Sequence, residues 1–322
     1  MAEHAEHSEQ HDEHGGGHAA HNPLDPKELF GHVSDSTELH VPRKLSEWTT
    51  GDTHGHIELP QPLKGEKPLY VVHTGNQLID RTIEPIDLKF TKFMMIELVV
   101  AILICVFFIG LAKALHGGAL ARGRFRNILE AMLLYFRDSV ARPCIGHHDA
   151  DKFVPYLWTI FFFVLGLNLF GMIPWMGSPT GSLAVTGALA LVTFVVVMGS
   201  AVAKLGPLGT VKSFVPHMDL PFLLKIFLIP LIFVIEVAGM LIKHGVLAIR
   251  LLANMMAGHV VLAVIMAFIA ASAGSMLWYV VTPTSVLGAT ALSLLELFVA
   301  FLQAYIFTFL SALFIGMAVH PH

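Results

Sequence analysis

The sequence predicts an all-α polytopic membrane protein with about five membrane helices, the last two long and tilted, and an amphipathic helix at the cytoplasmic surface. Of its 322 residues, 55% are hydrophobic and 14% are charged, whereas a soluble domain carries about 25% charged residues. The mean hydropathy is +0.67, and several apolar runs reach the length of about 20 residues that crosses a bilayer. A net charge of −4 does not suggest a nucleic-acid surface.

Residues 1–85 are predicted to be a polar, extracytoplasmic extension, and residues 86–322 the membrane domain. Residues 1–26 hold six acidic residues and no Lys or Arg, unlike an Arg-rich transit peptide, and no apolar core follows the start as in a signal peptide. These features favour a bacterial inner-membrane protein. Histidines that recur every three or four residues are candidate metal ligands, with a solvated tail as the favoured alternative: His4, His7, His11, His14, His18 and His21.

The first predicted span covers residues 93–115 and is followed by Arg122, Arg124 and Arg126. Positive charge next to a span marks the cytoplasmic side, so the N-terminus is predicted to lie outside. Residues 125–141 then predict an amphipathic helix that lies along the cytoplasmic surface. Its apolar face combines Phe125, Ile128, Leu129, Met132 and Phe136.

The second and third spans are predicted at residues 154–175 and 183–203. The loop between them has no basic residue, whereas the next connection carries Lys204 and Lys212. The third span therefore ends on the cytoplasmic side. Two further spans after it place the C-terminus in the cytoplasm.

Two longer apolar stretches follow, at residues 222–271 and 285–317. As a helix, the first would be about 75 Å long, more than twice the thickness of a hydrocarbon core of about 30 Å. We therefore expect it to be broken near Gly239 or Gly245, or to lie strongly tilted.

Arg250 is the residue of this stretch that points most directly to function. A guanidinium stays protonated, and placing it at bilayer depth costs about 2.5–3.5 kcal/mol on insertion scales. Glu236, Lys243 and Arg250 are seven residues apart and so share a stripe, which Asn254 joins one turn later. Lys243 could instead extend to the interface.

The last stretch adds Glu296 and Gln303, which are also seven residues apart. His259 is turned by roughly 180° from Arg250 and should face a different neighbour. A titratable pair such as His259 and Glu296 suits a proton path. The alternatives are a satisfied buried histidine at 259 and a structural ion pair between Glu296 and Arg250.

These residues resemble subunit a of the F-type ATP synthase, the membrane stator subunit beside the rotating ring of c subunits. The resemblance covers roughly residues 85–320. It rests on Glu236, on Leu295–Glu296, and on three runs of sequence: NLFGMIP at 168–174, RLLANMMAGH at 250–259 and QAYIF at 303–307.

The resemblance implies a mechanism in which protons pass through two offset half-channels to the carboxyl groups of the c ring. Arg250 would be the essential arginine that faces the ring. Asn254, His259, Glu296 and Gln303 would belong to the arginine site or the outer half-channel, and Glu236 to the inner one. Implied partners are the c ring, peripheral-stalk b subunits, a soluble catalytic head and the lipid bilayer, with no cofactor.

Two departures from the family pattern stand out. His259 and Glu296 occupy positions that some bacterial members fill in the reverse order, an exchange that mitochondrial members resemble. His244 stands where a proline commonly follows the lysine that matches Lys243. Both Lys243 and His244 are therefore further candidates for the proton path.

Other functional classes fit the sequence less well. No Gly-x-x-x-x-Gly-Lys-Ser/Thr run predicts nucleotide binding, so the chain is not expected to be catalytic alone. A metal-ion transporter with a His-rich tail is the main alternative, but the spans lack ligand pairs at helical spacing. A secondary transporter built on inverted repeats would need an internal symmetry that we do not detect.

Overall fold

The computed structural model describes the membrane domain and two short pieces of the N-terminal extension. Those residues are 36, 38–40, 56–58, 91–115, 124–173, 176–214 and 222–320. The strands β1 (Glu38–His40) and β2 (His56–Glu58) form an antiparallel pair, with Glu38 opposite Glu58. The six N-terminal histidines lie outside the described residues, so their metal binding stays a prediction.

Five of the described helices are long and apolar enough to cross a membrane, which confirms the predicted fold class. Their apolar composition favours the helix, because only a helix satisfies its own backbone hydrogen bonds in lipid. The helices are α4 (Lys92–Leu115), α7 (Ala150–Gly171), α8 (Leu183–Ser213), α9 (Phe222–Ala271) and α10 (Trp278–Val319).

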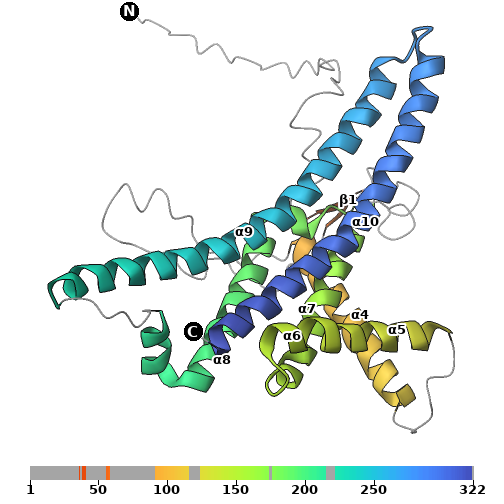
Figure 1. Cartoon of the computed structure of the whole chain (residues 1–322). Coiled ribbons are helices and arrows are strands. Elements are labelled where there is room, and N and C mark those ends of the chain that lie inside the picture. Colours follow the sequence, from red (N-terminus) through yellow and green to blue (C-terminus); the bar gives the residue numbers. More distant parts are fainter. Residues whose placement is uncertain are drawn as a thin grey trace, which may run out of the picture.

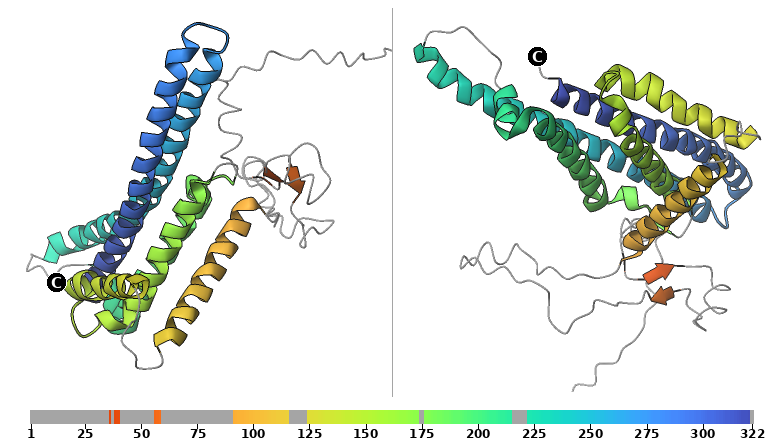
Figure 2. Two further views of the ribbon diagram at one scale, coloured as in Figure 1. Left: turned by 90° about the vertical axis from the view of Figure 1, so that its right-hand side faces the viewer. Right: turned by 90° about the horizontal axis from the view of Figure 1, so that it is seen from below.

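Helix α7 lies at the centre of the bundle, because it packs against both α4 and α10. Helix α8 packs against α9 and α10. The main core contains Leu157 and Phe161 of α7, Leu251 of α9, and Phe307 and Ile315 of α10. Figures 1 and 2 show that α9 and α10 run side by side to a shared turn that extends beyond the other helices. We call this the outer end, and the end that holds the C-terminus of α10 the inner end, following the predicted orientation.

The helix α9 is unbroken over 50 residues. Neither Gly239 nor Gly245 is among the glycines with a positive φ angle, so of the two alternatives the break is excluded and the tilt stays a prediction. The helix instead curves along its length, and its N-terminal part diverges from the bundle (Figure 1). The start of α10 at Trp278, seven residues before the predicted position, extends the pairing with α9.

The inner end is closed by a helical rod that lies across the bundle (Figures 1 and 2). It consists of α5 (Arg124–Tyr135), a π-helical segment (Phe136–Ala141) and α6 (Arg142–Ile145). Phe136 is buried, and the Trp158 Nε1 of α7 donates a hydrogen bond to the Leu133 carbonyl at 3.2 Å. Ile128, which we assigned to the apolar face, is 65% exposed.

A kink in α8 and the polar contacts of Lys204 hold the helices together at the inner end. The direction of α8 changes at Gly206, whose φ of 74° suits glycine, and Pro207 follows it. Just before the kink, Lys204 pairs with Asp149 and so joins α8 to the start of α7, with 2.6 Å between Nζ and Oδ2. Asp149 also pairs with Lys152 at 3.2 Å, while Lys204 Nζ lies 3.4 Å from the His320 ring at the end of α10.

Gly316 of α10 lies directly against the Cys144 carbonyl, and a Cβ added there would overlap that oxygen. Gly316→Ala should therefore destabilise the chain by about 1–3 kcal/mol, because the clash is with backbone. The thermal unfolding midpoint of the chain within its purified complex measures the effect. Gly288→Ala on the same helix meets nothing within 4 Å and should leave the midpoint unchanged or raise it slightly, because alanine favours the helix. Equal midpoints for the two variants would contradict the packing described.

Asp149 should make the stability of the inner end depend on acid pH. Hydrogen bonds from Lys204 and Lys152 lower the pKa of Asp149 from 3.8 to about 2. A lowered pKa in the folded state stabilises the fold above pH 3.8, and this contribution is lost as the pH falls toward 2. Asp149→Asn should lower the thermal midpoint at pH 7, with a difference from wild type that vanishes between pH 4 and 2. A difference that persists below pH 2 would exclude the ionised carboxylate as its cause.

Candidate functional site

Arg250 lies in the middle of α9 and is half-buried. Within the described part of the chain, no carboxylate lies within ion-pair distance of its guanidinium. The alternative in which Glu296 and Arg250 form a structural ion pair is therefore not what the structure contains. An arginine in an apolar helix with no anionic partner among the described residues must meet water or a charged group elsewhere.

An outer cavity of about 220 Å³ lies between α7, α9 and α10. The side chains that give it polarity are Asn168, Asn254, Glu296 and Gln303. Asn254 Nδ2 donates a hydrogen bond to Gln303 Oε1 at 2.8 Å, and Asn168 Nδ2 donates one to the Ala300 carbonyl at 3.3 Å. Three of the predicted proton-path residues thus come together, since Asn254, Glu296 and Gln303 share one cavity.

Gly258 brings the Glu296 carboxylate close to α9. A Cβ at position 258 would overlap the carboxylate oxygen Oε1 of Glu296, so any larger residue would displace the carboxylate from its present position. Two polar atoms beside the cavity, Asn168 Oδ1 and Gln303 Nε2, are buried and have no hydrogen-bond partner among the residues that the structure describes. Buried polar groups rarely remain unpaired, and the cavity is large enough for the waters that would bind them.

His259 lies apart from the outer cavity. Its imidazole interacts with the backbone of Gly171 at the outer end of α7, as expected for a residue turned away from Arg250. The Nε2 atom is buried and has no partner within the described chain. The sequence therefore predicted the different neighbour, but His259 and Glu296 do not line one common space.

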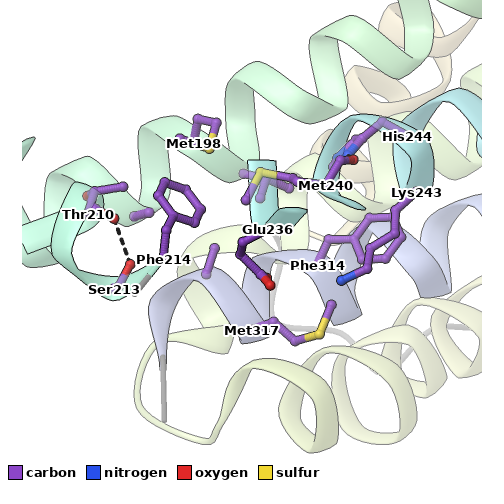
Figure 3. A pocket seen from close by; sticks show the side chains of 13 residues that line it. Met198, Thr210, Ser213, Phe214, Glu236, Met240, Lys243, His244, Phe314 and Met317 are labelled. Carbon is purple, nitrogen blue, oxygen red and sulfur yellow. Dashed lines mark hydrogen bonds between the residues drawn. The ribbon is translucent and has the colours of Figure 1, made fainter. Parts of the chain in front are cut away.

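An inner cavity of about 100 Å³ lies between α8, α9 and α10 (Figure 3). Glu236, Lys243 and His244 all line it, so the structure brings these three candidates together. Glu236 and Lys243 are exposed, while His244 is 5% exposed. The remaining lining includes Thr210 and Ser213 beyond the kink of α8.

The two cavities use different parts of α9, with Arg250 between them. The inner cavity touches α9 from Glu236 to His244, and the outer cavity touches it from Leu251 to Val261. Arg250 lines neither cavity. The arrangement is a charged group between two separate, mostly apolar cavities, each of which contains a few polar side chains.

Asn168 is the site residue that our sequence analysis did not assign to the proton path. It is 1% exposed and faces α10 from the middle of the bundle. The signal was available, because an amide within the mostly apolar stretch of residues 160–171 needs a polar partner. No group of three or more potential metal ligands occurs in the described ranges.

The fold and the site define a class of protein: a polytopic membrane protein with ionisable groups placed along two long paired helices. The family model described as "ATP synthase A chain" matches residues 93–316. The chain belongs to this family.

Curated relatives agree with the family model, and each of the following is named "ATP synthase subunit a". The protein of Myxococcus xanthus (strain DK1622) is 35% identical over 294 residues, which cover 90% of this chain and 88% of the relative. That of Anaeromyxobacter sp. (strain Fw109-5) is 32% identical over 319 residues, covering 95% and 74%. That of Anaeromyxobacter dehalogenans (strain 2CP-1 / ATCC BAA-258) is 42% identical over 199 residues, covering 61% of this chain and 49% of that relative.

The hydrogen bond between Asn254 and Gln303 should couple α9 to α10. We expect Asn254→Leu and Gln303→Leu each to lower stability by about 1–3 kcal/mol, because each leaves a polar partner unpaired. The double variant should lose less than the sum, by about 1 kcal/mol.

The measurement is a double-mutant cycle on the thermal unfolding of the purified complex. As a control, Asn254→Leu is combined with Ser200→Ala on α8, where the hydroxyl donates a hydrogen bond to the Val197 carbonyl of its own helix. That pair should be additive. Additivity for Asn254 and Gln303 would mean that the bond contributes nothing to stability.

Proposed function

We propose that this chain is the proton-translocating stator subunit of an F-type ATP synthase membrane sector, with two offset half-channels that lead to the c-ring carboxylates. It is not catalytic alone. It acts with the c ring, with peripheral-stalk b subunits and, through the stalk, with a soluble catalytic head. Family membership supports the subunit assignment, and the half-channels are argued below from the geometry.

The observation that carries this proposal is the position of Arg250 between two cavities that have no lining residue in common. A single continuous pore would let protons leak along the membrane potential. Two separate cavities, one at 236–244 and one at 251–261 of α9, force a proton to leave the chain and travel on another carrier between them. A ring of carboxyl groups that rotates past Arg250 is such a carrier.

The outer cavity is suited to proton entry. Glu296 can accept and return a proton, and the amides of Asn168, Asn254 and Gln303 can hold the waters that deliver it. The bond between Asn254 and Gln303 keeps α9 and α10 in register next to Arg250. His259 would act beside this path, toward α7, rather than within the cavity.

Arg250 would favour the ionised form of each c-ring carboxyl group that passes it. A fixed cation nearby favours the ionised carboxylate and so promotes proton release, and arginine does so dependably because burial does not neutralise it. Its permanent charge also repels a hydronium that would cross directly between the cavities. Each proton that completes the path gains about 2.3 kcal/mol per 100 mV.

The ring would dock on the exposed apolar face of α9. Val246 and Ile249, next to Arg250, are 46% and 57% exposed, and Val234 and Ile242 are 61% and 64% exposed. Apolar helices of a partner would cover this surface while their carboxyl groups reach Arg250. The inner cavity, with Glu236 and Lys243 at its exposed edge, then receives the released proton.

The orientation belongs to the proposal as well. Arg122, Arg124 and Arg126 follow the first span, and Lys204 lies beside the C-terminus of α10. All of these cations favour one side, which would be the cytoplasm of a bacterial cell. The N-terminus would then lie outside the inner membrane and the C-terminus inside. No observation on the described residues favours a metal-ion transporter.

Arg250→Ala should abolish ATP-driven proton pumping while the complex still assembles. Loss of one charge-stabilising group at a reacting centre costs about 100-fold or more. Passive proton leak in vesicles without the catalytic head should rise, because the barrier between the cavities is gone. Quenching of a pH-sensitive dye in inverted vesicles measures both quantities.

Lys152→Gln is the matched control, since it removes a cation that is 72% exposed and lies at the inner end. It should pump like the wild type. Near wild-type pumping by an assembled Arg250→Ala complex would overturn the proposal and leave Arg250 with a structural role.

A further inference from the structure

The inner cavity contains a buried histidine whose environment differs from that of an ordinary packed ring. His244 is 5% exposed, and its ring lies between Phe194 of α8 and Phe314 of α10, with centroid distances of 5.2 Å and 4.9 Å. His244 Nδ1 lies 2.9 Å from the Met240 carbonyl oxygen. The ring is thus held firmly on three sides.

These contacts fix which nitrogen carries hydrogen. A carbonyl oxygen only accepts, so Nδ1 must donate to Met240. In the neutral ring, Nε2 then keeps its lone pair and can accept a proton. This atom is buried and has no partner within the described chain, whereas a histidine that served packing alone would be expected to have one.

Water in the inner cavity can supply the missing partner. The cavity of about 100 Å³ lies beside His244 and extends to Glu236 (Figure 3), and each water needs only about 10–15 Å³ by the same measure. Along the helix, Glu236 and His244 are eight residues apart, which is about 12 Å. A short chain of waters can bridge that distance.

The charges around the ring favour rapid passage of a proton rather than its storage. Among the described residues that line the cavity, Glu236 and Lys243 are the ionisable neighbours of His244, both from α9. The lining from α8 includes the hydroxyls of Thr210 and Ser213, and that from α10 is Phe314, Met317 and Ala318. The Lys243 ammonium repels an imidazolium, while the Glu236 carboxylate attracts the proton onward.

We propose that His244 is a proton-relay residue of the inner half-channel. A cavity water or hydronium gives a proton to Nε2 as its O–H bond breaks, and Nε2 then returns a proton to a water that leads to Glu236. Throughout, Nδ1–H stays bonded to Met240, so the ring ends each cycle unchanged. This inference rests on the proposed function, because it needs the inner cavity to conduct protons.

His244→Asn tests the relay, because an amide nitrogen can still bond the Met240 carbonyl but cannot titrate. We expect normal assembly and about tenfold slower ATP-driven pumping in inverted vesicles. This loss is smaller than the about 100-fold effect of a lost general acid–base group, since cavity water remains. The pH profile should lose a titration step between pH 5 and 8, and added imidazole should restore part of the rate.

His244→Phe and Met198→Leu complete the set. The first keeps an aromatic ring between Phe194 and Phe314 and should pump as slowly as His244→Asn, but without imidazole rescue, because the ring fills the space. The second changes a neutral residue that lines the cavity and should resemble the wild type in rate and pH profile.

A wild-type rate and pH profile for His244→Asn would overturn the relay, as would a failure of both His244 variants to assemble, which would assign the residue to packing. The Arg250→Ala result distinguishes failure of the His244 relay from failure of the proposed function. If Arg250→Ala stops pumping while His244→Asn pumps normally, the relay alone fails. If Arg250→Ala pumps normally, the proposed function fails and the relay fails with it.

Discussion

A permanent positive charge at bilayer depth is the constraint on which the rest of this structure depends. The Arg250 guanidinium cannot give up its proton, and no described carboxylate of its own chain pairs with it. Its surroundings must therefore supply water or a charge from outside the chain. The cavities on either side of it along α9, each with some polar side chains in its lining, and the apolar exposed face beside it are consistent with that need.

The pairing of α9 with α10 allows these polar side chains to lie within a mostly apolar bundle. Small residues allow the close approach, since Gly258 leaves room for the Glu296 carboxylate. The amides of Asn254 and Gln303 then satisfy each other across the interface. Polar groups at this depth are stable when they are paired or reach water, and here the pairing also sets the register of the two helices.

The inner end gives the long helices a fixed base. The rod of α5, the π-helical segment and α6 lies across the bundle, and its C-terminal part packs on α10 where Gly316 meets the Cys144 carbonyl. Asp149 and Lys204 join α7 to α8 next to the kink at Gly206. This framework holds Phe194 and Phe314 on opposite helices around His244, which is why the proposed relay depends on packing that lies well away from Arg250.

The sequence by itself determined the membrane class, the approximate spans and the exceptional length of residues 222–271, because apolar run length and helical period are local properties of the chain. It also indicated that His259 turns away from Arg250, since position along a helix fixes direction around its axis. Only the tertiary structure decided that α9 curves without breaking, that Asn254 meets Gln303, and that Arg250 has no carboxylate partner among the described residues. Spacing gives the face on which a side chain lies, but the neighbour on that face depends on how the helices pack. The place of Asn168 opposite α10 and the aromatic contacts of His244 were decided in the same way.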